Sequence, residues 1–160
     1  MVEIAPFVPA HADGVVALIL PIQQSEFGIP ITLDEQPDLR DVPGFYQRGS
    51  GGFWVALDGA DVVGTIAMLD IGNRQGALRK MFVRASHRGA ELGVAARLLA
   101  TLVAWCETHG TRELYLGTTA PMRAAHRFYE KHGFQEIARG ALPERFPVMA
   151  VDTKFYQRAL

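Results

Sequence analysis

The sequence predicts a single mixed α/β (α+β) domain over residues 1–160, with a central, mostly antiparallel sheet of about seven strands flanked by about four helices. Three observations lead to this fold class. The length of 160 residues fits one domain. Three strand-like runs joined by tight turns occupy residues 52–83, as in an antiparallel meander. Strand-like and helix-like segments then alternate through the rest of the sequence.

The first fifty residues contain one strand, one helix and an irregular stretch. Weak alternation of apolar and polar residues predicts a strand over Val2–Val8. Apolar residues at helical spacing predict a helix over His11–Gln24, which Pro21 ends or kinks. Proline and glycine interrupt Ser25–Ser50, where we expect one or two short helices, near residues 34–39 and 42–47.

The middle of the chain predicts the meander. Runs rich in β-branched and aromatic residues indicate three strands, over 52–57, 62–69 and 77–83. The segments Asp58–Asp61 and Asn73–Gly76 carry the residues typical of the tight turns between them.

The last third predicts alternating helices and strands. The clearest helix is Leu92–Thr108, which Gly110 ends, and a second helix covers Pro121–His132. The predicted strands lie at residues 113–116, 135–138 and 148–156. The final strand could pair within the sheet or exchange with a second copy, so the sequence leaves a homodimer open.

Composition excludes several classes of protein. The 16 basic and 17 acidic residues give a formal net charge of −1, which does not favour a nucleic-acid or membrane partner. The single cysteine, Cys106, cannot form an internal disulfide, and no Cys/His spacing predicts a metal site. The first residues lack the pattern of a signal peptide, and the longest apolar stretch, Gly14–Ile22, is too short to cross a bilayer. We therefore expect a cytoplasmic protein.

The most informative segment is the junction between the third meander strand and the long helix. Arg88, Gly89 and Gly93 lie in this loop, which is followed by small residues. Backbone amides at such a junction, together with a helix N-terminus, can bind a phosphate. The loop is neither a P-loop nor a complete dinucleotide-binding glycine motif. From these residues alone, the glycines could equally serve only the turn and the packing of the helix.

Two motifs together resemble the GNAT N-acetyltransferase superfamily. The first comprises the strand Leu78–Val83, the Arg88-Gly89 loop and the helix Gly93–Trp105. The second is Ala125–Phe134, which resembles the family's alanine…phenylalanine-tyrosine…glycine-phenylalanine segment. The resemblance implies acetyl-CoA as the acetyl donor and an amine as the acceptor.

The resemblance also implies roles for particular residues. The strand residues Met81, Phe82 and Val83 would offer backbone groups to the pantetheine arm and polarise the acetyl carbonyl. The pyrophosphate would be bound by Arg88, Gly89, Glu91, Leu92, Gly93, Val94, Ala95 and Ala96. Tyr129 would donate a proton to the departing thiolate, although a tyrosine on an amphipathic helix often belongs only to the core.

The chain departs from the family pattern at two places, one in the glycine loop and one just before the second motif. Ala90 stands where the family usually has Gln or Arg, and Arg88 lies two residues earlier, so the loop is longer. Met122 occupies a position where many members carry an Asn that contacts the cofactor arm. A methionine cannot supply that hydrogen bond.

The sequence does not identify a general base. Asp70, Glu26 and His126 are candidates, although a solvated surface position is favoured for His126, and a chain of water molecules is an alternative. The irregular stretch Ser25–Ser50 corresponds to the region where family members bind the acceptor, and it supplies the substrate-binding candidates Glu26, Phe27 and Tyr46. These residues would suit a cationic small-molecule or peptide amine, but acidic residues there could equally cap short helices.

These observations predict an acetyl-CoA-dependent N-acetyltransferase in which the acceptor amine attacks the thioester directly within a ternary complex. The alternative is a non-catalytic module that senses acyl-CoA or mediates an interaction. The missing base and Met122 are the features that keep this alternative open.

Overall fold

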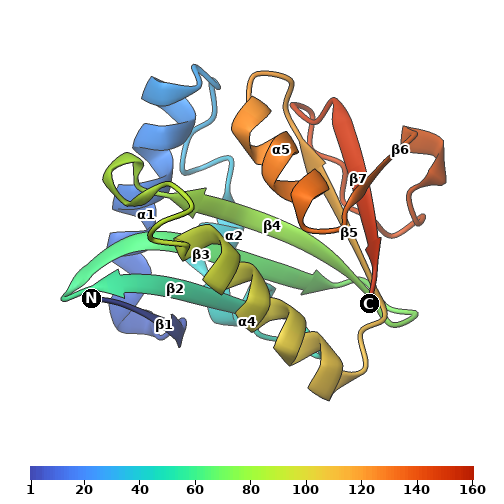
Figure 1. Cartoon of the computed structure of the whole chain (residues 1–160), viewed down its shortest axis with the longest axis horizontal. Coiled ribbons are helices and arrows are strands. Elements are labelled where there is room, and N and C mark those ends of the chain that lie inside the picture. The colour runs from blue at the N-terminus through green and yellow to red at the C-terminus, as the bar shows by residue number, and fades with distance from the viewer.

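A computed structural model describes residues 1–160 and contains one seven-stranded sheet (Figure 1). Its strand order is β1-β2-β3-β4-β5-β7-β6, and β4–β5 is the single parallel pair. The predicted fold class is therefore confirmed. The strands are β1 (Val2–Pro6), β2 (Gly52–Asp58), β3 (Asp61–Asp70), β4 (Gln75–Val83), β5 (Glu113–Thr118), β6 (Gln135–Ile137) and β7 (Lys154–Ala159).

The structure has five α-helices where about four were expected. They are α1 (Ala12–Pro21), α2 (Pro37–Arg40), α3 (Val42–Phe45), α4 (Val94–His109) and α5 (Arg123–Lys131). A π-helical turn, Ile22–Glu26, continues α1, because the Phe27 amide bonds to the Ile22 carbonyl at 3.1 Å. The additional helix arises because α2 and α3 are separate single turns, each with a proline near its start.

The sheet lies between two helical layers. Helices α4 and α5 cover one face, and α1, α2 and α3 cover the other (Figure 1). Alternate residues of β2 serve the two layers: Trp54 and Ala56 pack in the core that contains α4, whereas Phe53 and Val55 pack in the core that contains α1. Burial on both faces explains why this strand has an almost continuous apolar sequence.

The prediction for the final strand was wrong at its start. Residues 148–153 form turns and loop, and β7 begins only at Lys154. The Asp152 amide donates to the Met149 carbonyl at 3.0 Å, and Asp152 Oδ2 accepts from the Met149 amide at 3.1 Å. This turn overrides the alternating pattern that predicted a strand. β7 then pairs with β5 and β6 of its own chain.

The parallel pair opens soon after it begins. Only three residues of each strand pair: Gln75–Ala77 of β4 pair with Glu113–Tyr115 of β5. Beyond these residues the two strands diverge (Figure 1). Backbone groups on the facing edges therefore have no strand partner there. No helix of the structure combines the length and the apolar composition needed to cross a membrane.

A β-bulge in β4 lies beside this opening. Thr65 pairs with Phe82 and Ala67 with Arg79, so Lys80 and Met81 together oppose a single residue of β3. Lys80 adopts a φ of 54°, and its carbonyl accepts the Thr65 hydroxyl at 2.7 Å. A left-handed lysine is costly in backbone energy, and such strain is often found beside functional sites.

Candidate active site

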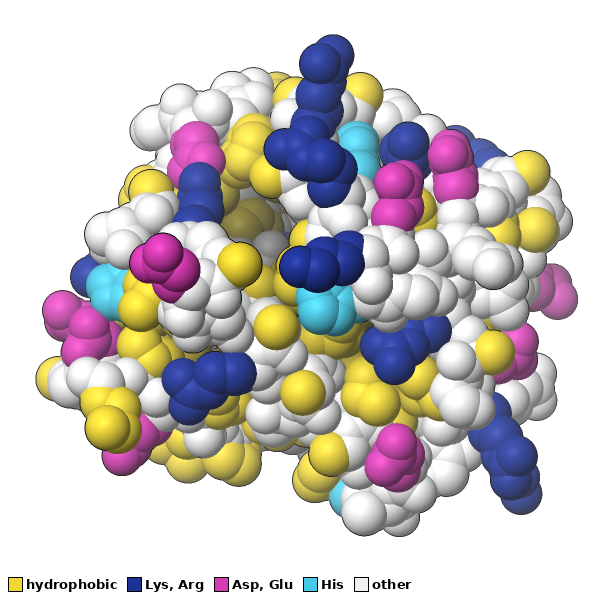
Figure 2. Space-filling model, viewed as in Figure 1, with side chains coloured by type: hydrophobic (Ala, Val, Ile, Leu, Met, Phe, Trp, Pro, Cys, Tyr) yellow, Lys and Arg dark blue, Asp and Glu magenta, His cyan; other side chains and the backbone are white.

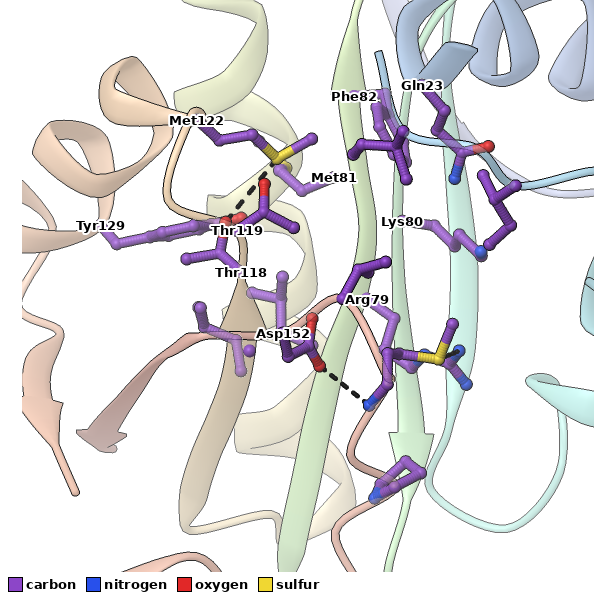
Figure 3. A pocket seen from close by; sticks show the side chains of 18 of the residues that line it. Gln23, Arg79, Lys80, Met81, Phe82, Thr118, Thr119, Met122, Tyr129 and Asp152 are labelled. Atoms are coloured by element: carbon purple, nitrogen blue, oxygen red, sulfur yellow. Dashed lines mark hydrogen bonds between the residues drawn. The ribbon is translucent and has the colours of Figure 1, made fainter. Parts of the chain in front are cut away.

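A cavity occupies the opening between β4 and β5 and is partly open to solvent. Figure 2 shows the hollow on the face covered by α4 and α5, with hydrophobic side chains inside it and charged side chains at its rim. Strand β4 supplies one wall, β5 and α5 supply the opposite wall, and the loop before β7 supplies the floor (Figure 3).

Tyr129 lies on the α5 side of this cavity. Its side chain is buried, with its ring 5.5 Å from Phe134 and 6.0 Å from Tyr156. No protein group shares a hydrogen bond with its hydroxyl, and burial raises the pKa of Tyr129. The residue is therefore held as a protonated donor in the cavity wall, which makes it available to a ligand.

Thr119 is the second wall residue with an uncommitted hydroxyl. Its Oγ1 is the one buried side-chain oxygen or nitrogen in the chain without a hydrogen-bond partner. The neighbouring Thr118 hydroxyl is directed instead at the Met122 sulfur, 3.7 Å away. Since an unpaired buried hydroxyl is costly, the Thr119 Oγ1 atom marks a place for a ligand's polar group.

His126 helps to position this wall. It is buried, and its Nε2 lies 2.8 Å from the Thr119 carbonyl oxygen. The favoured solvated position for His126 was therefore wrong, because the histidine fastens α5 to the end of β5. His126 does not line the cavity.

The glycine loop ends at the first turn of α4. Gly89 and Gly93 have φ values of 113° and 61°, a region that L side chains rarely adopt. The amides of Val94, Ala95 and Ala96 have no acceptor within the chain, as expected for an uncapped helix start. Glu91 and Leu92 are exposed beside them. This arrangement of free amides fits a phosphate group.

Two residues predicted for different ligands contact each other. The Arg88 guanidinium forms a two-pronged ion pair with Glu26, with one N–H donating at 2.8 Å, while Arg88 Nε donates to the Val83 carbonyl at 2.8 Å. Hydrogen bonding from Arg88 lowers the pKa of Glu26. The pair joins the turn after α1 to the loop before α4.

The remaining acceptor candidates lie behind the cavity wall. Tyr46 is completely buried, and its hydroxyl donates to Asp38 Oδ2 at 2.6 Å. Phe27 is partly buried against the core that contains α1. Neither residue lines the cavity. Asp70 also lies elsewhere, since its carboxylate accepts from the amides of Ser50 and Gly72 at the end of β3.

The Lys80 side chain enters a buried polar network. Its Nζ donates to Gln36 Oε1 at 2.5 Å and lies 3.5 Å from Asp38 Oδ2. Gln36 in turn exchanges side-chain hydrogen bonds of 2.9 and 3.0 Å with Gln23. Burial lowers the pKa of Lys80, while Asp38 opposes this effect. Asp38 balances the lysine charge, so the network stiffens the β4 wall without adding net charge to it.

The structure also brings Asp152 into the cavity. Its carboxylate is half-buried, and burial raises its pKa, opposed by the Met149 amide and by Arg79, Arg139 and Lys80. Gly117 makes room for it, because a Cβ there would stand 2.5 Å from Asp152 Oδ2. The position was missed because the chain around Asp152 was predicted as a strand, and only the observed turn directs this carboxylate inward.

The comparisons with known proteins identify the family of this fold. The model of the acetyltransferase (GNAT) family matches residues 18–134. The chain belongs to the GNAT acetyltransferase family. A GNAT-family acetyltransferase from Staphylococcus aureus Mu50 superposes with a TM-score of 0.95 at 36% identity, and the match covers 99% of each chain.

Curated relatives match a smaller region. The probable N-acetyltransferase family 8 member 5 of Mus musculus is 32% identical over 109 residues, which cover 65% of this chain and 47% of the relative. The N-acetylaspartate synthetase of Xenopus tropicalis is 34% identical over 104 residues, which cover 62% of this chain and 37% of the relative. This GNAT chain therefore spans half or less of the length of these relatives.

Proposed function

We propose that this protein transfers an acetyl group from acetyl-CoA to an amine, by direct attack of the amine within a ternary complex. The observation that carries the proposal is the opening between β4 and β5, because it combines unpaired strand edges with the uncommitted hydroxyl of Tyr129. Family membership supports acyl transfer. That the acyl group is acetyl, that the acceptor is an amine and that the amine attacks directly are parts of what we propose.

The free edge of β4 suits the pantetheine arm. An extended chain of amides can add to a strand edge as an extra strand, here beside Met81, Phe82 and Val83. The Thr119 hydroxyl lies across the cavity and would supply the polar contact that Met122 cannot make. The free amides of Val94, Ala95 and Ala96 would receive the pyrophosphate at the start of α4. Gly89, Glu91, Leu92 and Gly93 would complete that loop, with Arg88 at its edge.

Bound acetyl-CoA supplies the acetyl group as a thioester. Asp152 takes the proton that the acceptor nitrogen loses as the new N–C bond forms, and a β4 amide stabilises the developing oxyanion. The C–S bond breaks, and Tyr129 donates to the departing sulfur. Because the pKa of Tyr129 is raised and that of a thiol is about 8.5, most of this help comes from the hydrogen bond rather than from complete proton transfer.

No observation favours the non-catalytic alternative. That alternative depended on the missing general base and on Met122, which cannot make a hydrogen bond to the cofactor arm. Asp152 provides a carboxylate that can act as the base, and Thr119 provides a hydroxyl for that hydrogen bond, in the same cavity. A module that only senses acyl-CoA would need neither a half-buried carboxylate nor a free phenol there.

The proposal is tested by release of the CoA thiol. Purified protein is incubated with acetyl-CoA and a panel of small amines and peptide N-termini, and thiol release is followed with mass detection of the acetylated amine. We expect release above the amine-free rate together with equimolar acetyl-amine. Binding of acetyl-CoA by calorimetry without transfer to any amine would overturn catalysis, and absence of binding would overturn the cofactor assignment as well.

A further inference from the structure

Arg79 is the cation of the cavity that forms no ion pair within the chain. It lies on β4 before the bulge, half-buried, and its side chain lines the cavity (Figure 3). None of the six ion pairs of the chain includes it. Its side chain makes one hydrogen bond, from Nη2 to the Met149 sulfur at 3.2 Å. A thioether is a weak acceptor, so most of the five N–H groups of the guanidinium remain available.

Two aromatic rings hold this guanidinium in place. Arg79 Cζ lies 5.7 Å from the centre of the Phe45 ring and 5.8 Å from that of Tyr46. Contacts with ring faces hold a guanidinium without occupying its in-plane donors. Tyr46 is itself fixed by its hydrogen bond to Asp38. Arg79 is therefore oriented before any ligand arrives, which reduces the entropy lost on binding.

The other charges of the cavity have different partners. Lys80 is balanced by Asp38. Asp152 accepts from the Met149 amide and lies more than 4.0 Å from the Arg79 nitrogens, since no ion pair joins them. One unpaired guanidinium and one separate carboxylate thus face the same space. Their arrangement complements a small molecule that carries an amine and a carboxylate.

We propose that the acceptor is an amine that also carries a carboxylate, as an amino acid does, and that Arg79 binds this carboxylate while the amine lies towards Asp152. The inference rests on the proposed function and narrows its substrate class. Arg79 is distant along β4 from the phosphate loop, which follows Val83, so the free cation belongs to the acceptor part of the cavity. The planar fork of a guanidinium matches a carboxylate with two parallel hydrogen bonds.

The first test changes only the acceptor. Thiol release is measured with the unaltered protein for a set of amino acids. Each is compared with the analogue in which either the α-carboxylate or the side-chain carboxylate is replaced by an amide. We expect kcat/KM to fall at least about tenfold when the carboxylate becomes an amide, because a site built for an ionic partner rejects the neutral analogue. Equal kcat/KM values for acids and amides would overturn the inference while leaving acetyl transfer established.

A binding measurement separates the inference from the proposed function. N-acetylated amino acids and their amides are titrated calorimetrically into the protein saturated with CoA. Preference for the acids supports the carboxylate site even if no amine is acetylated, in which case only the proposed catalysis fails. Equal affinity for acids and amides contradicts the site directly.

The second test changes Arg79. We expect Arg79→Gln to raise KM for carboxylated acceptors about tenfold and to leave kcat/KM for their amides within about twofold. Arg79→Lys keeps the charge but not the two-pronged geometry, so its KM for carboxylated acceptors should lie between the values of the unaltered protein and of Arg79→Gln. Arg112→Gln, at an exposed arginine outside the cavity, is the matched control and should change neither. Equal losses for acids and amides in Arg79→Gln would show a structural role only.

Discussion

The two sides of the cavity are built from different parts of the chain. The proposed cofactor side uses backbone groups that are nearly continuous in sequence: the β4 edge, the glycine loop and the first amides of α4. The proposed acceptor side uses side chains from separate segments: Gln23, Arg79, Lys80 and Asp152 line the cavity, and Asp38 balances the charge of Lys80. The first side is local and the second is assembled by folding.

The difference has a physical cause. A phosphate or an extended amide chain can be bound by backbone N–H and C=O groups, which every residue has, so what matters is where glycine and small residues permit close approach. An acceptor must be recognised by particular charges and shapes, which only side chains provide. Variation of those side chains can change the acceptor while the cofactor side stays the same.

The largest effect should come from Tyr129, where the two sides meet. We expect Tyr129→Phe to lower kcat about 100-fold, because the departing sulfur loses its hydrogen-bond donor, with the dissociation constant of acetyl-CoA unchanged. Steady-state kinetics and calorimetry check both parts. Tyr115→Phe, at a tyrosine bonded to Glu113 away from the cavity, is the matched control. Unchanged turnover would remove Tyr129 from the mechanism.

Asp152 tests the acceptor side through pH. A base must be deprotonated, so activity should fall as pH decreases through the pKa of Asp152, which burial raises above the ordinary 3.8. We expect Asp152→Asn to lower kcat/KM about 30-fold and to remove this acid limb from the pH profile. Asp70→Asn should keep the limb, because Asp70 lies outside the cavity. An acid limb that persists in Asp152→Asn contradicts the assignment.

Thr119 tests the cofactor side with a smaller effect. Thr119→Val removes the uncommitted hydroxyl, and we expect KM for acetyl-CoA to rise about fivefold, the value of one hydrogen bond of about 1 kcal/mol. Thr119→Ser should restore the original KM. If Thr119→Val binds acetyl-CoA as tightly as the unaltered protein, the hydroxyl does not contact the cofactor.

The smallest effect should come from Glu26, which joins the two sides through Arg88. Part-exposed ion pairs contribute about 0–1 kcal/mol, so redirecting Arg88 to a phosphate costs little. We expect Glu26→Gln to lower KM for acetyl-CoA less than about fivefold, with the effect fading in high salt. Arg88→Met should raise the same KM. If Arg88→Met leaves KM for acetyl-CoA unchanged, Arg88 only pairs with Glu26 and does not contact the phosphate.

The sequence located most of the elements because their signals are local. The tight turns and alternating strands of the meander, the long helix and Gly110 at its end all depend on neighbouring residues. Tyr129 was predicted through a motif on one helix, and it lines the cavity. The start of β7 was predicted wrongly because the pattern over residues 148–153 resembled a strand, whereas a side-chain-to-backbone bond made by Asp152 folds it into a turn.

By itself, the sequence determined the fold class, the family resemblance and the position of the glycine loop before α4, since each depends on residues close together in the chain. Only the tertiary structure decided which charges remain free. It paired Arg88 with Glu26 and Lys80 with Asp38, and it left Arg79 unpaired in the cavity with Asp152. Such pairing depends on distances between segments far apart in sequence and on burial, and no local pattern encodes either quantity.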